Sequence, residues 1–437
     1  MRTLSQPDTA GAGVSTLETA SGERAVGLLE REAMRRGTRA ALLITALTVA
    51  ALMISAGCSD DGDPQAGGSE RRDTSANAAE VEQFSGSVDD FYEVPDPLPP
   101  GEPGDVIRRM PIESPAGQSG WRVMYHSTDA QGDDRAVTGV VFHPTGTPPE
   151  GGWPIVAWAH GTSGLASACA PSRRGTPPPE FGVQGVHVAT DYIGLGPVGE
   201  LHPYLSAAAE GHAVIDGVIA ARSMPEVDGG NRWVVTGVSQ GGHAALVTGE
   251  MAADRLPDAD LLGTVAIAPG SQLAKSFGDD LQARAITAMV LFGAATEDPA
   301  IDPRNFLNPE VYEPAAEAIE QGCISEITTA MVPLAARPDF YVTDPRSDPV
   351  GAAWLAENDP GKVASKSPLL LVQGGQDPLV VPARTDSLFA QLCGLGQVVD
   401  RLDVPTANHD TVTKESESEV SAWLAARFDG APAQDEC

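Results

Sequence analysis

Short apolar runs of strand length alternate along this chain with longer stretches of helical spacing. The first two runs, Trp121–Ser127 and Val137–Phe142, are predicted to pair antiparallel, because a polar turn separates them. Further strands are predicted at Ile155–Ala159, Val186–Thr190, Trp233–Thr236, Gly263–Ala268, Pro368–Gln373 and Gln397–Leu402. Helices are predicted at Leu205–Met224, Gln240–Met251, Ala383–Leu392 and Glu415–Arg427. Uninterrupted apolar runs are typical of strands buried on both faces, so the alternation predicts an α/β fold with a mostly parallel central sheet between helices.

One long segment interrupts this alternation. About 95 residues, 270–367, separate two of the predicted strands, and a structureless loop of that length is improbable in a compact domain. We expect this segment to be an inserted helical cap over the carboxyl edge of the sheet. Its larger apolar side chains are suited either to lining a lipid pocket or to forming the core of the cap itself: Ile286, Met289, Leu291, Phe292, Phe306, Tyr312, Phe340 and Tyr341.

The N-terminal segment has the composition of an export signal. Three arginines between Met34 and Ala40 precede an apolar run at 40–57 that ends in small residues. Cys58 follows directly, as in bacterial lipoprotein signals, in which this thiol is lipidated. We therefore predict that residues 34–57 are a lipoprotein-type signal peptide, that residues 1–33 are a mis-annotated upstream extension, and that Cys58 carries a membrane anchor. The alternative for the apolar run is a single membrane-spanning helix near the lower length limit.

The remaining chain divides into a tether and a folded domain. Residues 58–90 are rich in Asp, Gly, Ser and Glu, which favours a disordered acidic tether, and residues 91–437 are predicted to form the folded domain. Acidic residues outnumber basic ones by 60 to 28, giving a formal net charge of −32. Because this charge repels phosphate backbones, the sequence excludes nucleic acid as a partner.

One motif indicates a nucleophile. Gly237-Val238-Ser239-Gln240-Gly241 has the G-x-S-x-G pattern, directly after a predicted strand and at the start of a predicted helix. A nucleophile elbow needs a serine on such a turn, with small flanking residues because the backbone is crowded there. The helix N-terminus then offers N–H groups to a developing oxyanion. We predict that Ser239 is the nucleophile; the structural alternative is an ordinary N-cap.

A serine nucleophile needs a general base that follows it in this chain order. Six histidines precede Ser239 and are therefore excluded: His126, His143, His160, His187, His202 and His212. His243 lies only one helical turn beyond the serine, where a side chain packs beside the site. His409, in a loop after the last predicted strand, is therefore the predicted base.

The acid that orients this base should end an intervening strand. Asp377 follows a Gly-Gly turn at the carboxyl end of the predicted strand Pro368–Gln373, which is the expected position. Asp403 and Asp410 are competing acids, and Asp403 also ends a strand. We predict Asp377 as the third catalytic residue.

Two backbone donors should complete the site. One is the amide of Gln240, directly after the nucleophile, and the other is expected from the glycine-containing loop after Ile155–Ala159, where we select the amide of Thr162. No metal or organic cofactor is required. Gly194–Gly199 matches the dinucleotide pattern G-x-G-x-x-G, but Pro197 interrupts the helix that such a motif must open.

The cysteines favour an oxidising compartment. With Cys58 assigned to the lipid, four remain: Cys169, Cys323, Cys393 and Cys437. An even number in an exported protein predicts two disulfides, and four cysteines allow three pairings. No C-x-x-C motif occurs, so neither a zinc site nor a redox motif is indicated.

The ordered motifs of residues 91–437 resemble the secretory lipase family of α/β-hydrolases. The resemblance rests on Trp158-Ala159-His160-Gly161-Thr162, Cys169-Ala170-Pro171-Ser172, Thr190-Asp191-Tyr192, His202-Pro203-Tyr204, Gly237–His243, Gln373–Pro378 and His409. It implies an α/β-hydrolase fold, a Ser239, Asp377 and His409 triad, a helical cap over an acyl pocket, and the disulfides Cys169–Cys323 and Cys393–Cys437.

The expected function is hydrolysis of a small-molecule or lipid ester by an exported serine lipase or esterase, secreted or anchored at the cell surface. Three alternatives remain open. An acyltransferase of the cell envelope would use the same triad, a peptidase would cleave amides, and a non-catalytic lipoprotein of this fold would bind lipid without turnover.

Overall fold

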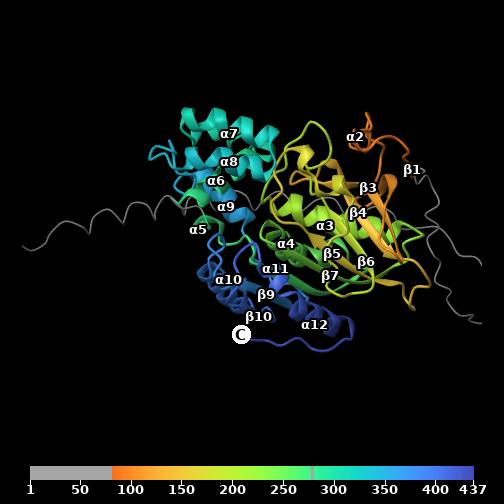
Figure 1. The fold of residues 1–437 in the computed structure, drawn as a ribbon. Coiled ribbons are helices and arrows are strands. Elements are labelled where there is room, and N and C mark those ends of the chain that lie inside the picture. Colours follow the sequence, from red (N-terminus) through yellow and green to blue (C-terminus); the bar gives the residue numbers. More distant parts are fainter. Residues whose placement is uncertain (1–80, 277–279) are drawn as a thin grey trace, which may run out of the picture. The chain divides into compact units, whose positions relative to one another are not determined.

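The structure is a computed structural model that describes residues 81–276 and 280–437 (Figure 1). The predicted signal peptide, Cys58 and the upstream extension 1–33 lie outside the described residues. Ten strands of the described chain form one sheet. Their bounds are β1 (Glu82–Gln83), β2 (Val106–Ile112), β3 (Gln118–Thr128), β4 (Asp134–Pro144), β5 (Trp153–Ala159), β6 (Val186–Thr190), β7 (Gly229–Val238), β8 (Asp260–Ile267), β9 (Leu369–Gly374) and β10 (Val399–Val404).

The sheet is antiparallel at one side and parallel through its centre. Its strand order is β1-β2-β3-β4-β6-β5-β7-β8-β9-β10. The pairs β2–β3, β3–β4 and β4–β6 are antiparallel, and all pairs from β6–β5 to β9–β10 are parallel. Strand order reverses at β5, which lies between β6 and β7. In open α/β sheets the carboxyl ends of strands at such a reversal form the usual ligand site.

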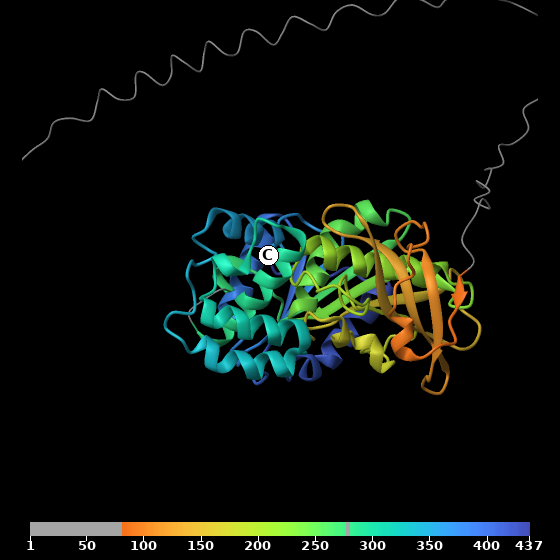
Figure 2. The same ribbon diagram turned by 90° about the horizontal axis from the view of Figure 1, so that it is seen from above.

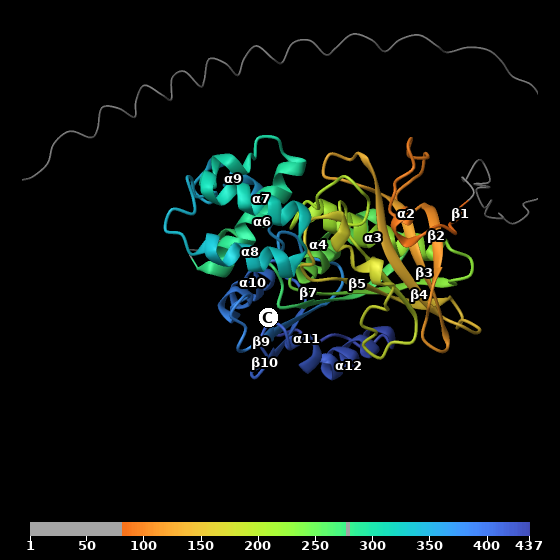
Figure 3. The same cartoon turned by 45° about the horizontal axis from the view of Figure 1, so that its top comes forward.

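Eleven α-helices of the described chain surround this sheet. They are α2 (Val88–Phe91), α3 (Ala207–Ser223), α4 (Gln240–Arg255), α5 (Leu273–Ser276), α6 (Leu281–Glu297), α7 (Pro309–Gln321), α8 (Ile324–Ala335), α9 (Pro349–Asn358), α10 (Pro382–Gly394), α11 (Val412–Glu415) and α12 (Glu417–Phe428). Helices α3 and α4 lie on one face of the sheet and α12 on the other (Figures 1 and 3). Among the described residues, no helix combines the length and apolar character that a bilayer crossing requires.

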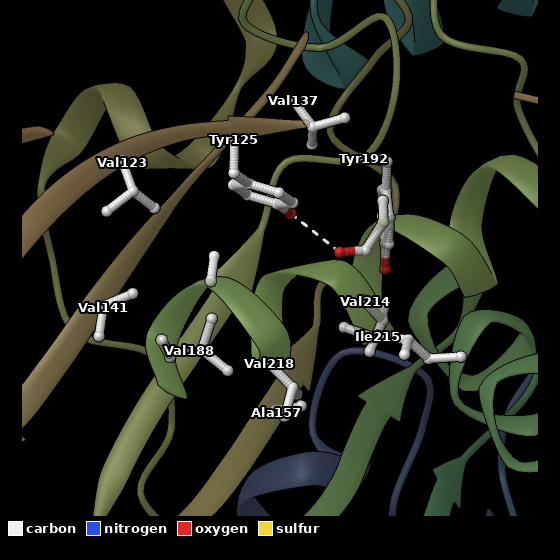
Figure 4. Close-up of a cluster of buried hydrophobic side chains, with 14 of the residues drawn as sticks. Val123, Tyr125, Val137, Val141, Ala157, Val188, Tyr192, Val214, Ile215 and Val218 are labelled. Atoms are coloured by element: carbon white, nitrogen blue, oxygen red, sulfur yellow. Dashed lines mark hydrogen bonds between the residues drawn. The ribbon is translucent and has the colours of Figure 1, made fainter. Parts of the chain in front are cut away.

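Alternate residues of the central strands supply two separate cores. Ile155 and Ala157 of β5 pack in a cluster with α3 and α4, whereas Val156 packs in a cluster with α12. This two-residue period is expected for strands buried on both faces. The core on the α3 side includes side chains from β3, β4, β6 and α3, gathered around Tyr125 and Tyr192 (Figure 4). The α/β fold with helices on both faces is therefore confirmed.

The predicted strands and helices are all present, with ends that differ by a few residues. Three elements at the N-terminal side were missed: β1, α2 and β2. The predicted tether boundary at Asp90 is wrong by several residues, because β1 pairs with β2 and α2 already begins at Val88. Phe91 and Tyr92 are fully buried, so this segment is held by apolar contacts despite its acidic composition.

The segment between β8 and β9 consists of helices α5 to α9, which gather at one end of the molecule away from β1–β4 (Figure 2). Its apolar side chains form a core together with Leu165, Tyr204 and Leu205 from outside the segment. Met289, Leu291, Phe292 and Phe306 are buried together in it, and Tyr341 packs against it. The role of this segment as a cap over a substrate stays a prediction.

Candidate functional site

Ser239 stands at the turn between β7 and α4, with φ 59° and ψ −116°. L-residues seldom adopt positive φ, and such strain persists only where neighbouring structure imposes it. Here the Ser239 amide donates to the Ile267 carbonyl at 2.9 Å, and the Ser239 carbonyl accepts from the Gly270 amide at 2.9 Å. Both contacts come from the carboxyl end of β8, which therefore fixes the turn.

Both glycines of the motif are required because a side chain at either position would clash with the backbone. A Cβ on Gly241 would lie 1.9 Å from the carbonyl oxygen of Ala159, and a Cβ on Gly237 would lie 2.0 Å from the carbonyl oxygen of Gly241. No real side chain tolerates these separations. The start of α4 therefore packs directly on the end of β5, as the crowded turn of a nucleophile elbow requires.

A pocket opens at Ser239. It encloses about 660 Å³, a volume that includes space open to solvent. Ser239 and Gln240 line it together with Pro378–Val381, the loop that follows Asp377. The other lining includes the apolar side chains of Leu205, Leu273 and Ile286, and the polar side chains of Tyr204, Ser276, Asp280, Gln282 and Arg384.

Asp377 and His409 form a hydrogen-bonded pair at the same sheet edge. The Nδ1 atom of His409 lies 2.7 Å from Oδ2 of Asp377. The other carboxylate oxygen accepts from the amides of Leu379 at 2.8 Å and Val380 at 2.9 Å. The Asp377 side chain is fully buried and that of His409 is 16% exposed. This arrangement orients the imidazole and leaves its Nε2 atom free of the carboxylate.

The two competing acids have other surroundings. The Asp403 carboxylate accepts hydrogen bonds from Arg401 and is largely exposed. In the described ranges, no hydrogen bond or ion pair joins Asp410 to the His409 ring. Of the three candidates, Asp377 is therefore the acid that contacts His409.

The loop chosen for the second oxyanion donor lies beside the serine. A Cβ on Gly161 would lie 3.9 Å from the Ser239 Cβ. Next to it, the hydroxyl of Thr162 is 2.8 Å from that of Tyr204. The Gln240 amide opens α4, where the first N–H groups have no acceptor inside the helix. The loop that carries Thr162 and the start of α4 thus both adjoin Ser239.

A buried ion pair lies directly behind this turn and was missed by the sequence analysis. His243 Nδ1 is 2.6 Å from Oε2 of Glu210, and His243 Nε2 is 2.8 Å from the Asn358 carbonyl oxygen. Both side chains are fully buried. Burial opposes the charge on each group, but the attraction of the partner outweighs it, so the pKa of His243 is raised and that of Glu210 is lowered to about 2. The only sequence signal was the position of His243 one turn after Ser239.

Both disulfides implied by the family resemblance are present. Cys169–Cys323 connects residues 154 apart in sequence, and Cys393–Cys437 connects residues 44 apart. The first lies beside the loop after β5, since the Ile324 amide donates to the Ser163 carbonyl at 2.9 Å. The lipidated cysteine predicted at Cys58 lies outside the described residues.

The aromatic side chains singled out in the α5–α9 segment belong to this buried core and do not line the pocket. Of the eight apolar residues singled out in the sequence, only Ile286 lines the Ser239 pocket. Within residues 81–276 and 280–437, no group of three His, Cys, Asp or Glu side chains is arranged to hold a metal ion.

Comparisons with known proteins identify a family and relatives for this chain. Residues 180–436 match the family model described as secretory lipase. A probable inactive lipase of Mycobacterium tuberculosis (strain CDC 1551 / Oshkosh) is 22% identical over 377 residues, which cover 80% of this chain and 84% of that protein.

Two solved structures share the fold. Candida antarctica lipase A in its closed state is 17% identical with a TM-score of 0.64, over 79% of this chain and 87% of that chain. The rice cell wall degrading esterase LipA from Xanthomonas oryzae is 21% identical with a TM-score of 0.60, over 76% of this chain and 100% of that chain.

Proposed function

Because the chain belongs to the secretory lipase family of α/β-hydrolases, we propose that it is an exported serine hydrolase that cleaves carboxylic esters of lipids. In this proposal Ser239 is the nucleophile, His409 the general base and Asp377 the acid that orients it. The observation that carries the proposal is the 2.7 Å contact between His409 Nδ1 and the buried Asp377 carboxylate. That contact fixes the tautomer in which Nε2 accepts a proton.

The chemistry proceeds through an acyl-enzyme. Ser239 Oγ attacks the ester carbonyl carbon while its proton moves to His409 Nε2, and the carbonyl oxygen becomes an oxyanion held by the amides of Thr162 and Gln240. The C–O bond to the alcohol then breaks, and His409 donates the proton to the leaving alkoxide. Water attacks the acyl-enzyme with His409 again as base, which releases the acid and restores the serine.

We propose that the pocket binds the acyl group of a lipid ester. Apolar side chains line the pocket together with Ser239: Leu205, Leu273, Ile286, Leu379 and Val380. An alkyl chain is stabilised there by about 0.8 kcal/mol per buried methylene. Triacylglycerol-type esters are therefore the proposed class.

The proposed location is outside the cytoplasm. Family membership and two disulfides support export, since disulfides persist in oxidising compartments. Attachment to the membrane through a lipid on Cys58 is part of the proposal.

A second candidate is a non-catalytic lipid-binding protein of the same fold. The M. tuberculosis relative bears the name probable inactive lipase, and this observation favours the alternative. The two candidates differ in turnover alone, so one experiment separates them.

The test uses the exported chain on p-nitrophenyl esters from C2 to C16 and on emulsified triglyceride. We expect hydrolysis by the wild type, loss to background in Ser239→Ala, and unchanged rates in Ser223→Ala, at the far end of α3. A serine-directed alkyl phosphonate should label Ser239. Equal activity in wild type and Ser239→Ala overturns the proposal, and binding without turnover favours the second candidate.

A further inference from the structure

The side chain of Gln240 is anchored in a buried polar cluster. Its Nε2 atom lies 2.8 Å from Oε1 of Glu210 and 2.7 Å from Nε2 of His202. Gln240, Glu210 and His202 are each at most 2% exposed. The residue whose backbone amide is the proposed oxyanion donor therefore has its side chain held by two groups of the segment 202–210.

The hydrogen-bond roles in this cluster follow from its acceptors. His202 Nδ1 faces the Ile193 carbonyl at 2.7 Å, so it carries the proton and Nε2 accepts. The Gln240 NH₂ group then donates to both His202 Nε2 and Glu210. His243 Nε2 faces a backbone carbonyl and therefore donates, and His243 Nδ1 faces Glu210 Oε2. The raised pKa of His243 and the lowered pKa of Glu210 favour the ion pair, in which Nδ1 also donates.

The same segment also contacts the second proposed donor. The Tyr204 hydroxyl lies 2.8 Å from the Thr162 hydroxyl, and the Tyr204 amide donates to the His202 carbonyl at 2.8 Å. The Leu205 amide donates to Glu210 Oε1 at 3.1 Å. One short segment, anchored at Glu210, therefore contacts the side chains of both Thr162 and Gln240.

We infer that the segment from His202 to Glu210 positions both oxyanion donors, the Gln240 amide through its side chain and the Thr162 amide through Tyr204. Glu210, His243 and Tyr204 are then positioning residues, and this inference rests on the proposed function. A buried ion pair adds little net stability, because desolvation offsets its attraction. Oxyanion stabilisation depends instead on donors fixed in place before charge develops, and small displacements lower it.

The first experiment compares Glu210→Gln with Asp216→Asn. Both acids lie on α3, are buried and pair with a side chain of α4: Glu210 with the buried His243 and Asp216 with the partly buried Arg255. We expect Glu210→Gln to lower kcat by roughly 10- to 100-fold, less than the loss of a complete oxyanion donor, with KM nearly unchanged. Asp216→Asn should lose stability and keep its kcat per folded molecule.

The second experiment compares Tyr204→Phe with Tyr125→Phe. Each change removes one buried tyrosine hydroxyl bonded to a threonine hydroxyl, since Tyr125 donates to Thr190 at 2.7 Å (Figure 4). We expect a lower kcat in Tyr204→Phe. We expect an unchanged kcat in Tyr125→Phe, because Tyr125 lies on β3.

Two inhibitors separate positioning from general damage. An alkyl trifluoromethyl ketone forms a tetrahedral oxyanion on serine, whereas the corresponding secondary alcohol binds without an adduct. For Glu210→Gln and Tyr204→Phe, affinity for the ketone should fall in parallel with kcat/KM, and affinity for the alcohol should stay within about twofold of wild type.

The inference is overturned if affinities for both inhibitors fall equally, or if both variants keep the wild-type kcat while Ser239→Ala is inactive. If Glu210→Gln does not fold, the two tyrosine variants decide the question. Activity that survives in Ser239→Ala instead overturns the proposed function itself, so the two failures are distinguishable.

Discussion

Two aspartates at the carboxyl ends of neighbouring strands differ in what they can do. Asp377 is buried, accepts two backbone amides and contacts His409, whereas Asp403 is exposed and contacts Arg401. In the proposed mechanism, the negative charge of Asp377 can therefore stabilise the imidazolium of His409. The charge of Asp403 is neutralised by an arginine and screened by water.

We predict that Asp377→Asn lowers kcat by roughly 10³- to 10⁴-fold, because the amide favours the wrong imidazole tautomer and removes the stabilising charge. Asp403→Asn is the matched control and should retain wild-type kcat. Both are measured as kcat per phosphonate-reactive site. A large loss in the Asp403 variant, with none in the Asp377 variant, would reverse the assignment of the acid.

At this scale the sequence could predict residues whose role is fixed by position along the chain. Ser239, Asp377 and His409 were predicted from motif, strand ends and order, and the structure joins Asp377 to His409. Glu210 could not be found, because its contacts with Gln240 and His243 depend on how α3 packs on α4. No periodicity in one helix reveals a partner on another.

At the scale of elements, the two disulfides hold different parts of the fold. Cys169–Cys323 joins the region after β5 to the start of α8, and Cys393–Cys437 joins the end of α10 to the last residue. A Cβ on Gly164 would lie 2.7 Å from Cys169 Sγ, so the first bridge packs closely on the loop beside Ser239. In the unfolded chain, the two bridges close loops of very different length.

We predict that removing Cys169–Cys323 by a double alanine substitution destabilises the protein more than removing Cys393–Cys437. Loop closure over 154 and 44 residues gives about 5 and about 4 kcal/mol, hence a difference of about 1 kcal/mol. Urea denaturation of both variants measures it. A larger loss in the Cys393/Cys437 variant would contradict this prediction.

The pattern of apolar runs predicted the central strands because these strands are buried on both faces. Strand β2 was missed because Arg108 and Arg109 interrupt its apolar pattern. Arg108 is nevertheless buried, with its guanidinium over the Phe84 ring and paired with Glu82. Arg108 is buried by tertiary contacts with a segment that was predicted to be a tether. A local pattern of apolar residues does not reveal such contacts.

At the scale of the whole molecule, strand order could not be predicted. Alternation of strands and helices indicates a parallel sheet, but the placement of β5 between β6 and β7 depends on chain crossovers. That placement brings the loop carrying Thr162 beside Ser239, because Ala159 and Gly237 are in register. The site is therefore a consequence of topology as much as of motif.

Several acidic residues gather around Glu297, where the α5–α9 segment contacts the start of α3. Glu297, at the end of α6, is bonded to the Ser206 hydroxyl at 2.9 Å. Burial, offset in part by this bond, and the negative charges of Asp129, Glu210 and Glu357 raise the pKa of Glu297 to about 7. Between pH 4.5 and 7 the folded chain thus holds a proton that the unfolded chain has released.

Stability should therefore fall as pH rises from about 4.5 to 7, and we predict that Glu297→Gln removes this fall. Glutamine keeps an acceptor for Ser206 but cannot ionise, so the advantage of the variant over wild type should grow by roughly 3 kcal/mol from pH 4 to pH 8. Urea denaturation at both pH values gives the double difference. The prediction is wrong if the advantage of the variant over wild type does not grow with pH. Glu297 would then ionise as readily in the folded chain as in the unfolded one, and the contact between α6 and α3 would be insensitive to pH.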